Sequence, residues 1–357
     1  MKKNIFYLLM ATILLLSCDG NGKGSTFFKQ TSVGQPYELL VVCEHDFWKA
    51  PAGEALDYVL KSDIPGLPQP EYSFRVSQTS PTNFTQIIKP FRNIIEVQID
   101  PTRYTQSKFK YTKDKYASPQ MVMTIQSPNA NDFQEFVTNN AQTILDFFTS
   151  AEMNRELELL KKQYNRAFLD SIQKIFGFDM YIPASLTGIK SGKDFLWASD
   201  INTAKESIMN IVVYSYPYTD KNTFTHEYFV KKRNEILGKH IRGNREDRYM
   251  GTDSLLITVK DSQFRGKYMQ DARGLWVMEN DMMGGPFVSH SFVDQMNNRV
   301  IVAEGFVYAP GIRKGNMMRQ LEASVYSLKL PVDKEIENAV AIPEIIAEDT
   351  VKTDIKE

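Results

Sequence analysis

The run from Arg273 to His290 holds the side chains of this chain that are best suited to chemistry. Trp276 offers a flat stacking face, and Glu279, Asp281 and His290 are residue types that accept or donate protons. Together with Arg273 they form the predicted binding site.

A purely structural interpretation of the same run is the one we favour. The sequence Met-Gly-Gly-Pro at 283–286 would let a ligand approach the backbone closely, but its glycines equally suit the turn of a β-hairpin. Trp276 would then fill the core, because tryptophan is usually largely buried.

Other catalytic patterns are incomplete. His226 and Glu227 begin like a zinc-protease helix, but Val230 stands where a second histidine is needed.

Cys43 and His45 would share one face of a continued strand, so a thiolate–imidazole pair is conceivable. A buried cysteine beside a surface histidine is the interpretation we favour, because free cysteine is so often buried. No cofactor, metal site or catalytic residue is predicted.

The start of the chain carries the most specific pattern. Two lysines lead into an apolar run at 5–16, which suits a secretory signal and is too short to span a bilayer. Leu15-Leu16-Ser17-Cys18 resembles the bacterial lipobox, with a small residue before the cysteine. The resemblance implies cleavage of a signal peptide at 1–17 and lipidation of Cys18. An ordinary signal peptide with an incidental cysteine is the alternative.

Residues 18–32 are predicted to form a flexible tether, because 19–26 are polar and rich in glycine. The expected localisation is the cell envelope, anchored to a membrane through lipid on Cys18. No surface-export pattern follows Cys18, so we expect the body to face the periplasm.

Composition limits the function classes. Hydrophobic residues make up 42% of the chain, which supports packed cores. The net charge of −1 provides no field for binding nucleic acid. With Cys18 lipidated, Cys43 is the only remaining thiol, so no intramolecular disulfide can form.

Apolar periodicity predicts an N-terminal unit of strands and helices. The predicted strands are 38–43, 72–76, 94–99 and 120–126, and the predicted helices are 54–61 and 131–148. The basic and aromatic stretch at 108–115 is predicted to be an exposed hairpin or loop.

A helix at 151–177 is predicted to connect this unit to a second one, with a kink near 149–150 and Gly177 as its C-cap. Four strands at 254–259, 274–279, 287–294 and 299–308 follow a helix at 225–237. Asn297-Asn298 is predicted to make the last two a hairpin, and a helix at 317–328 closes the unit.

The predicted fold class is therefore α+β, with two units of mainly antiparallel sheet and flanking helices joined by a long helix. The predicted domains are 33–150 and 178–331, with the connecting helix at 151–177 between them. Residues 332–357 are predicted to be a disordered acidic tail.

The lipobox, the aromatic-rich body and the run from Gly274 to His290 together resemble a family of uncharacterised lipoproteins from Bacteroidetes, a domain of unknown function. The resemblance covers roughly 30–331 and implies no activity. The second unit also resembles the PsbP-like fold in the order of its elements and in its Tyr-Ile-Pro-Ala-Ser start at 181–185. That resemblance implies an antiparallel sheet flanked by helices, an architecture that mostly serves binding or assembly.

The sequence favours a non-enzymatic envelope protein that binds a protein or glycan partner. The alternative is a hydrolase of envelope polymers that uses Glu279, Asp281 or His290 as acid–base groups.

Overall fold

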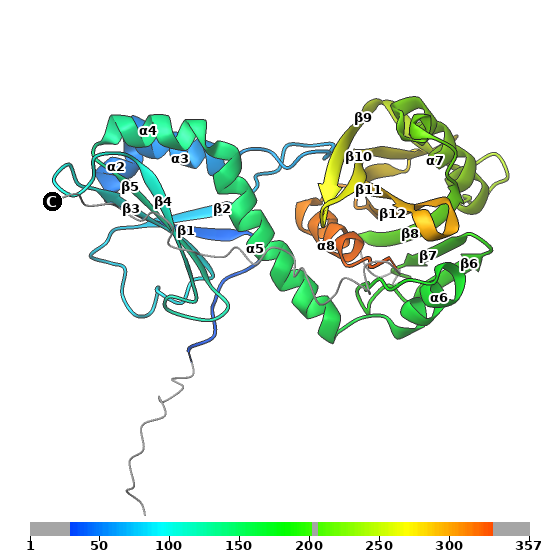
Figure 1. Cartoon of the computed structure of the whole chain (residues 1–357), viewed down its shortest axis with the longest axis horizontal. Helices are drawn as coiled ribbons and strands as arrows, with labels where there is room; N and C mark the ends of the chain where they lie inside the picture. The colour runs from blue at the N-terminus through cyan, green and yellow to red at the C-terminus, as the bar shows by residue number, and fades with distance from the viewer. Residues whose placement is uncertain (1–28, 202–205, 331–357) are drawn as a thin grey trace, which may run out of the picture.

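The computed structural model describes residues 29–201 and 206–330 (Figure 1). The predicted signal peptide, most of the predicted tether and the predicted acidic tail lie outside these residues. Within the described ranges, no helix is long and apolar enough to cross a membrane.

The N-terminal domain is built on a five-stranded sheet in the order β2-β1-β3-β5-β4. Its strands are β1 (Glu38–Val42), β2 (Arg75–Thr79), β3 (Asn93–Ile99), β4 (Lys108–Lys113) and β5 (Met121–Ser127). The first three pairings of that order are parallel, and only β4 runs antiparallel to its neighbour. The stretch predicted as an exposed hairpin or loop is therefore mostly strand β4, at one sheet edge.

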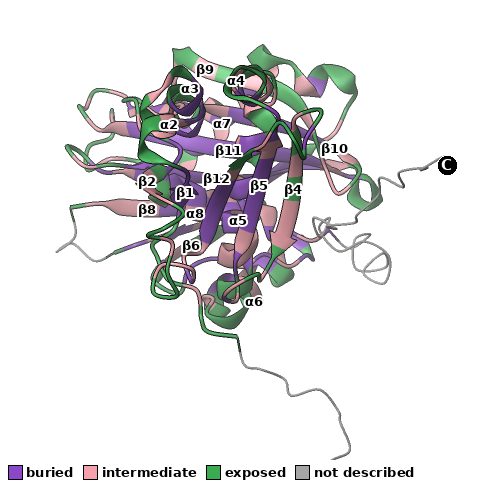
Figure 2. Cartoon of the chain, turned by 90° about the vertical axis from the view of Figure 1, so that its left-hand side faces the viewer, coloured by how far each residue is buried: buried purple, intermediate pink, exposed green. Residues whose placement is uncertain are grey.

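Burial on both faces explains the parallel arrangement. All five residues of β1 are buried, which is typical of parallel strands covered on both sides. Helices α2 (His45–Lys49), α3 (Pro51–Leu60), α4 (Ala130–Asn139) and α5 (Ala141–Lys162) cover one face. Phe84, Ile88, Phe91 and Tyr116, from connecting segments, cover the other. Figure 2 shows the buried strands between these layers.

Asparagines set the helix boundaries that the sequence prediction missed. The predicted helix at 131–148 breaks at Asn140, which ends α4 and precedes α5, and no break occurs at 149–150. The predicted helix at 151–177 is two helices, because Asn165 accepts a hydrogen bond from the Phe168 N–H and starts α6 (Arg166–Phe176). Gly177 is the left-handed C-cap of α6, as predicted.

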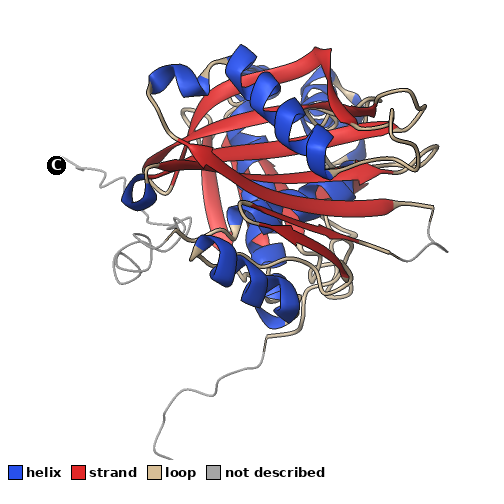
Figure 3. Ribbon diagram, turned by 90° about the vertical axis from the view of Figure 1, so that its right-hand side faces the viewer, coloured by secondary structure: helices blue, strands red, loops and turns tan. Residues whose placement is uncertain are grey.

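The C-terminal domain contains a fully antiparallel seven-stranded sheet in the order β6-β7-β8-β12-β11-β10-β9. The strands are β6 (Gly188–Gly192), β7 (Phe195–Ser199), β8 (Ile208–Pro217), β9 (Met250–Phe264), β10 (Lys267–Met278), β11 (Gly284–Asp294) and β12 (Arg299–Tyr308). Helices α6 and α8 (Gly315–Tyr326) pack on one face and α7 (His226–His240) on the other (Figure 3). Short 3₁₀ turns, η2 (Lys221–Phe224) and η3 (Gln295–Asn297), precede α7 and β12.

The α+β fold class is confirmed, and seven of the ten strand pairings among the described residues are antiparallel. The predicted hairpin of the last two strands is also confirmed, with Asn298 at φ 48° in its turn. The mainly antiparallel description applies to the chain as a whole and to the C-terminal sheet. It was wrong for the N-terminal sheet, which is mainly parallel.

A buried ion pair fixes α7 on the sheet. The Arg233 guanidinium donates to Glu304 at 2.9 and 2.7 Å, and both side chains are fully buried. The same guanidinium lies 4.0 Å from the ring centroid of Phe287 and donates to Thr252 Oγ1 at 2.7 Å. Both charged groups therefore have hydrogen-bond partners, which a buried ion pair needs in order to be tolerated in the core.

We expect Arg233→Met to lower the free energy of unfolding by about 3–5 kcal/mol, because it leaves the Glu304 carboxylate buried and unpaired. The double variant Arg233→Met, Glu304→Leu should recover most of that loss. Urea denaturation of both variants tests this, and a double variant as unstable as the single one would contradict it.

Candidate functional site

The predicted site residues lie on the β10–β11 hairpin, but they fall into separate groups and do not form one site. Alternation along the strands sends neighbouring side chains to opposite faces of the sheet. Val288 packs with the α8 helix, whereas Phe287 and Trp276 pack on the α7 side. His290 therefore shares the α8 face with Val288, and Trp276 lies on the other.

Arg273 and His290 form one cluster beneath α8. The Arg273 guanidinium donates to Asp271 at 3.0 Å and pairs with Glu322 of α8. His290 is fully buried, its Nε2 lies 3.5 Å from an Asp271 oxygen, and its ring contacts Tyr326. These contacts hold α8 to the sheet and leave the imidazole without solvent access.

Trp276 fills the core on the opposite face. Its side chain is buried, and its indole N–H donates to the Val307 carbonyl at 3.1 Å. Gly285 is required for this packing, because a Cβ there would lie 2.0 Å from the Val307 oxygen. The glycine therefore leaves room for the neighbouring strand β12. The buried indole has no exposed face on which a ligand could stack.

Glu279 and Asp281 lie at the far end of the hairpin. Asp281 pairs with Arg248 at 2.7 Å, and the Glu279 side chain lies against Gly251. His290 is six residues along β11 from its first residue, a separation of roughly 20 Å at about 3.3 Å per residue. The carboxylates and the imidazole therefore cannot act on one substrate atom.

The Asp271 cluster predicts a pH dependence. Burial raises the Asp271 pKa, but the His290 N–H and the Arg273 guanidinium lower it by more, so the net shift is downward from the ordinary value of 3.8. A carboxyl with a lower pKa in the folded state stabilises the fold above its unfolded-state pKa, and this contribution is lost as the pH falls through the folded-state value.

We therefore expect the extra unfolding free energy of wild type over Asp271→Asn to shrink as the pH falls below about 3.8. Urea denaturation at a series of pH values measures it. If this difference in unfolding free energy stays constant down to strongly acidic pH, protonation of Asp271 is not coupled to unfolding.

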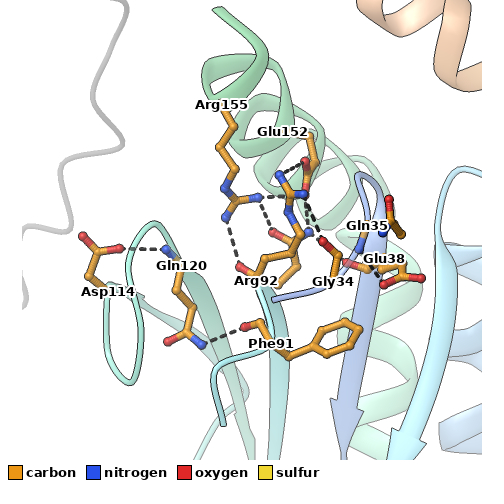
Figure 4. Close-up of polar contacts among 10 residues, drawn as sticks. Gly34, Gln35, Glu38, Phe91, Arg92, Asp114, Gln120, Glu152 and Arg155 are labelled. Carbon is orange, nitrogen blue, oxygen red and sulfur yellow. Dashed lines mark hydrogen bonds and ion pairs between the residues drawn. The ribbon is translucent and has the colours of Figure 1, made fainter. Parts of the chain in front are cut away.

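A second charged cluster lies where α5 meets the sheet of the N-terminal domain. Glu152 is buried and binds Arg92 at 2.8 Å and Arg155 at 2.7 Å. The buried Asn93 amide donates to the same carboxylate, and its oxygen accepts from Arg155 at 2.8 Å. Figure 4 shows both guanidinium groups converging on Glu152. Burial lowers the pKa of Arg155.

This cluster borders a cleft of about 300 Å³ between α5 and α8. Arg319 of α8 enters from the C-terminal domain, donates to the Ser73 carbonyl at 2.7 Å and lies 3.8 Å from the ring centroid of Tyr37. Gln320 of α8 donates to Glu156 of α5 at 2.9 Å. The cleft is therefore part of the junction that joins the two domains.

We expect Glu152→Gln to lower the free energy of unfolding by about 3–5 kcal/mol, because two partly buried guanidinium groups lose their shared carboxylate. Glu158→Gln on the same helix is the matched control. It removes an exposed pair with Lys161 and should change stability by less than about 0.5 kcal/mol. Equal effects of the two substitutions would contradict the role of Glu152.

A larger groove of about 570 Å³ lies on the outer side of α3. Its walls are Trp48 and Lys49 of α2, the outward stripe of α3 and the segment that follows α3. The lining residues are Trp48, Lys49, Glu54, Asp57, Tyr58, Lys61, Ser62, Asp63 and Tyr72. Among the described residues, no three His, Cys, Asp or Glu side chains are grouped to hold a metal ion.

Sequence reasoning missed this groove, although one signal was available. The helix predicted at 54–61 placed Leu56 and Leu60 inward, which leaves Tyr58 outward among charged residues. Tyr72 was assigned to a half-buried strand, but β2 begins only at Arg75 and Tyr72 is exposed. The Cys43 thiol, by contrast, is buried as favoured, and burial raises its pKa to about 12.

Comparison with known families divides the chain at the break between α5 and α6. Residues 32–161 match a family model described as Domain of unknown function (DUF8532), and residues 165–327 match one described as Domain of unknown function (DUF4837). Both matches are to uncharacterised domain families. No curated protein matches the chain. The two matched segments coincide with the two domains of the structure.

Proposed function

We propose that this chain is a lipid-anchored protein of the cell envelope, a non-enzymatic module that binds a protein or glycan partner. Cys18 carries the lipid, and the residues after it tether the two domains on the periplasmic side of a membrane. The sequence from Leu15 to Cys18 supports the anchor, because cleavage needs the small residue and lipidation needs the thiol.

The groove on α3 is the observation that carries the binding role. It lies outside the junction between the domains, so a ligand can reach it without separating them. Tyr58 and Tyr72 are 82% and 62% exposed, although aromatic rings of this size usually bury most of their surface. Exposed rings beside polar groups in a groove are typical of recognition sites.

The alternative, a hydrolase using Glu279, Asp281 or His290, finds no support in the geometry. Asp281 is held in a half-buried ion pair with Arg248, and His290 is buried six residues along β11 from the start of that strand, roughly 20 Å at about 3.3 Å per residue. Acid–base catalysis requires both groups within hydrogen-bond reach of one substrate.

We expect wild type to fractionate with membranes and to capture a crosslinked envelope partner, whereas Cys18→Ala should lose the membrane association. The reason is that two or three acyl chains anchor a protein stably, and no helix among the described residues is long and apolar enough to cross a membrane in their place. Fractionation followed by affinity capture from crosslinked cells measures both properties.

Cys43→Ala is the matched control and should fractionate like wild type, because this buried thiol lies in the core of the N-terminal domain. Repeated recovery of the wild-type protein alone would overturn the binding role. Membrane association of Cys18→Ala would overturn the anchor.

A further inference from the structure

The α3 groove has a preformed shape. Gly53 allows α2 to pack directly on α3, because a Cβ at this position would lie 2.4 Å from the Phe47 carbonyl oxygen. Phe47 in turn packs edge-on against the buried Phe133, with centroids 5.2 Å apart. Trp48 is thereby fixed at one wall of the groove. A preformed site loses little conformational freedom when a ligand binds.

The opposite wall is fixed by backbone pairing. Asp63 and Tyr72 form an antiparallel bridge, and the Ile64 N–H donates to the Glu71 carbonyl at 2.9 Å. Tyr72 therefore stands beside the end of α3, where Tyr58 projects outward. Three aromatic rings, from α2, α3 and this paired segment, line one groove.

The charges of the groove are mixed. Glu54, Asp57 and Asp63 supply three carboxylates, and Lys49 and Lys61 supply two ammonium groups. An anionic ligand would be repelled by the carboxylates and a cationic one by the lysines. The same groups offer many acceptors and donors to a ligand that is neutral but rich in hydroxyl groups.

Two polar atoms at the groove have no hydrogen-bond partner among the described residues. They are Asp57 Oδ1 and Ser62 Oγ, both buried. The other Asp57 oxygen accepts from Lys61 at 2.7 Å, so the carboxylate is held in place with one acceptor unused. Both atoms are screened from solvent, so the groups that a ligand can reach are the other polar atoms of the lining, such as those of Glu54, Asp63 and Lys61.

We propose that the α3 groove binds a neutral oligosaccharide, with about two or three sugar rings in its volume of about 570 Å³. The rings of Trp48, Tyr58 and Tyr72 stack on the apolar C–H faces of the sugars, and the carboxylates accept hydrogen bonds from the hydroxyl groups. This inference rests on the proposed binding function and names its ligand class.

The test uses the full chain in a detergent without sugar head groups, and calorimetry as the readout. The neutral probes are maltotriose and triacetylchitotriose. The deacetylated chitotriose is the cationic counterpart, and trigalacturonate is the anionic one. We expect a neutral probe to bind more tightly than either charged probe.

We expect Tyr58→Ala and Tyr72→Ala each to weaken this binding roughly tenfold, because each removes a stacking ring. Tyr58→Phe and Tyr72→Phe keep the ring and should bind within about threefold of wild type. Tyr249→Ala, a partly exposed tyrosine of the C-terminal domain, is the matched control and should bind like wild type. Thermal unfolding of each variant verifies that it is folded.

Failure of both neutral probes at millimolar concentration, or tighter binding of a charged probe, overturns the inference. Unchanged binding in folded Tyr58→Ala and Tyr72→Ala also overturns it. If crosslinked wild type still captures a specific envelope partner in these cases, the proposed binding function stands and only the ligand class is wrong.

Discussion

One carboxylate holds the two domains in their arrangement. Glu71, in the segment after α3, accepts hydrogen bonds from the backbone N–H groups of Lys314 and Gly315 at 2.6 and 2.9 Å. These are the first N–H groups of α8, which has no side-chain cap of its own. A negative charge at a helix N-terminus is favourable because it meets unpaired donors and the positive end of the helix dipole. The N-terminal domain therefore caps the closing helix of the C-terminal domain.

The rest of the junction follows from this contact. Gly66 lies against the Arg273 side chain, and Leu67 packs on the core beneath α8. Arg319 reaches back from α8 to the Ser73 carbonyl. Figure 1 shows the segment between α3 and β2 reaching from the N-terminal domain to the C-terminal domain. Because Tyr72 adjoins Glu71, one wall of the α3 groove belongs to the same segment that fixes the domain arrangement.

Strands and helices with a regular apolar pattern could be predicted from the sequence, but the pairing of the strands could not. The run Glu38–Val42 predicts a strand, yet its parallel neighbours β2 and β3 are joined to it only through intervening segments. Parallel pairing depends on helices that cover the sheet, and no local pattern encodes it. For the same reason the run from Arg273 to His290 was correctly interpreted as a β-hairpin, while the face reached by each side chain depended on the register between β10 and β11.

The sequence by itself determined the α+β class, the buried cysteine, the closing helix and the expectation of a lipid anchor at Cys18, because each depends on local composition or spacing. Tertiary structure decided which polar residues share a site. It separated His290 from Asp281, paired Arg273 with Glu322, and brought Trp48, Tyr58 and Tyr72 together at one groove. Contacts between residues distant in the chain arise from packing and strand register, which the order of residues does not reveal locally.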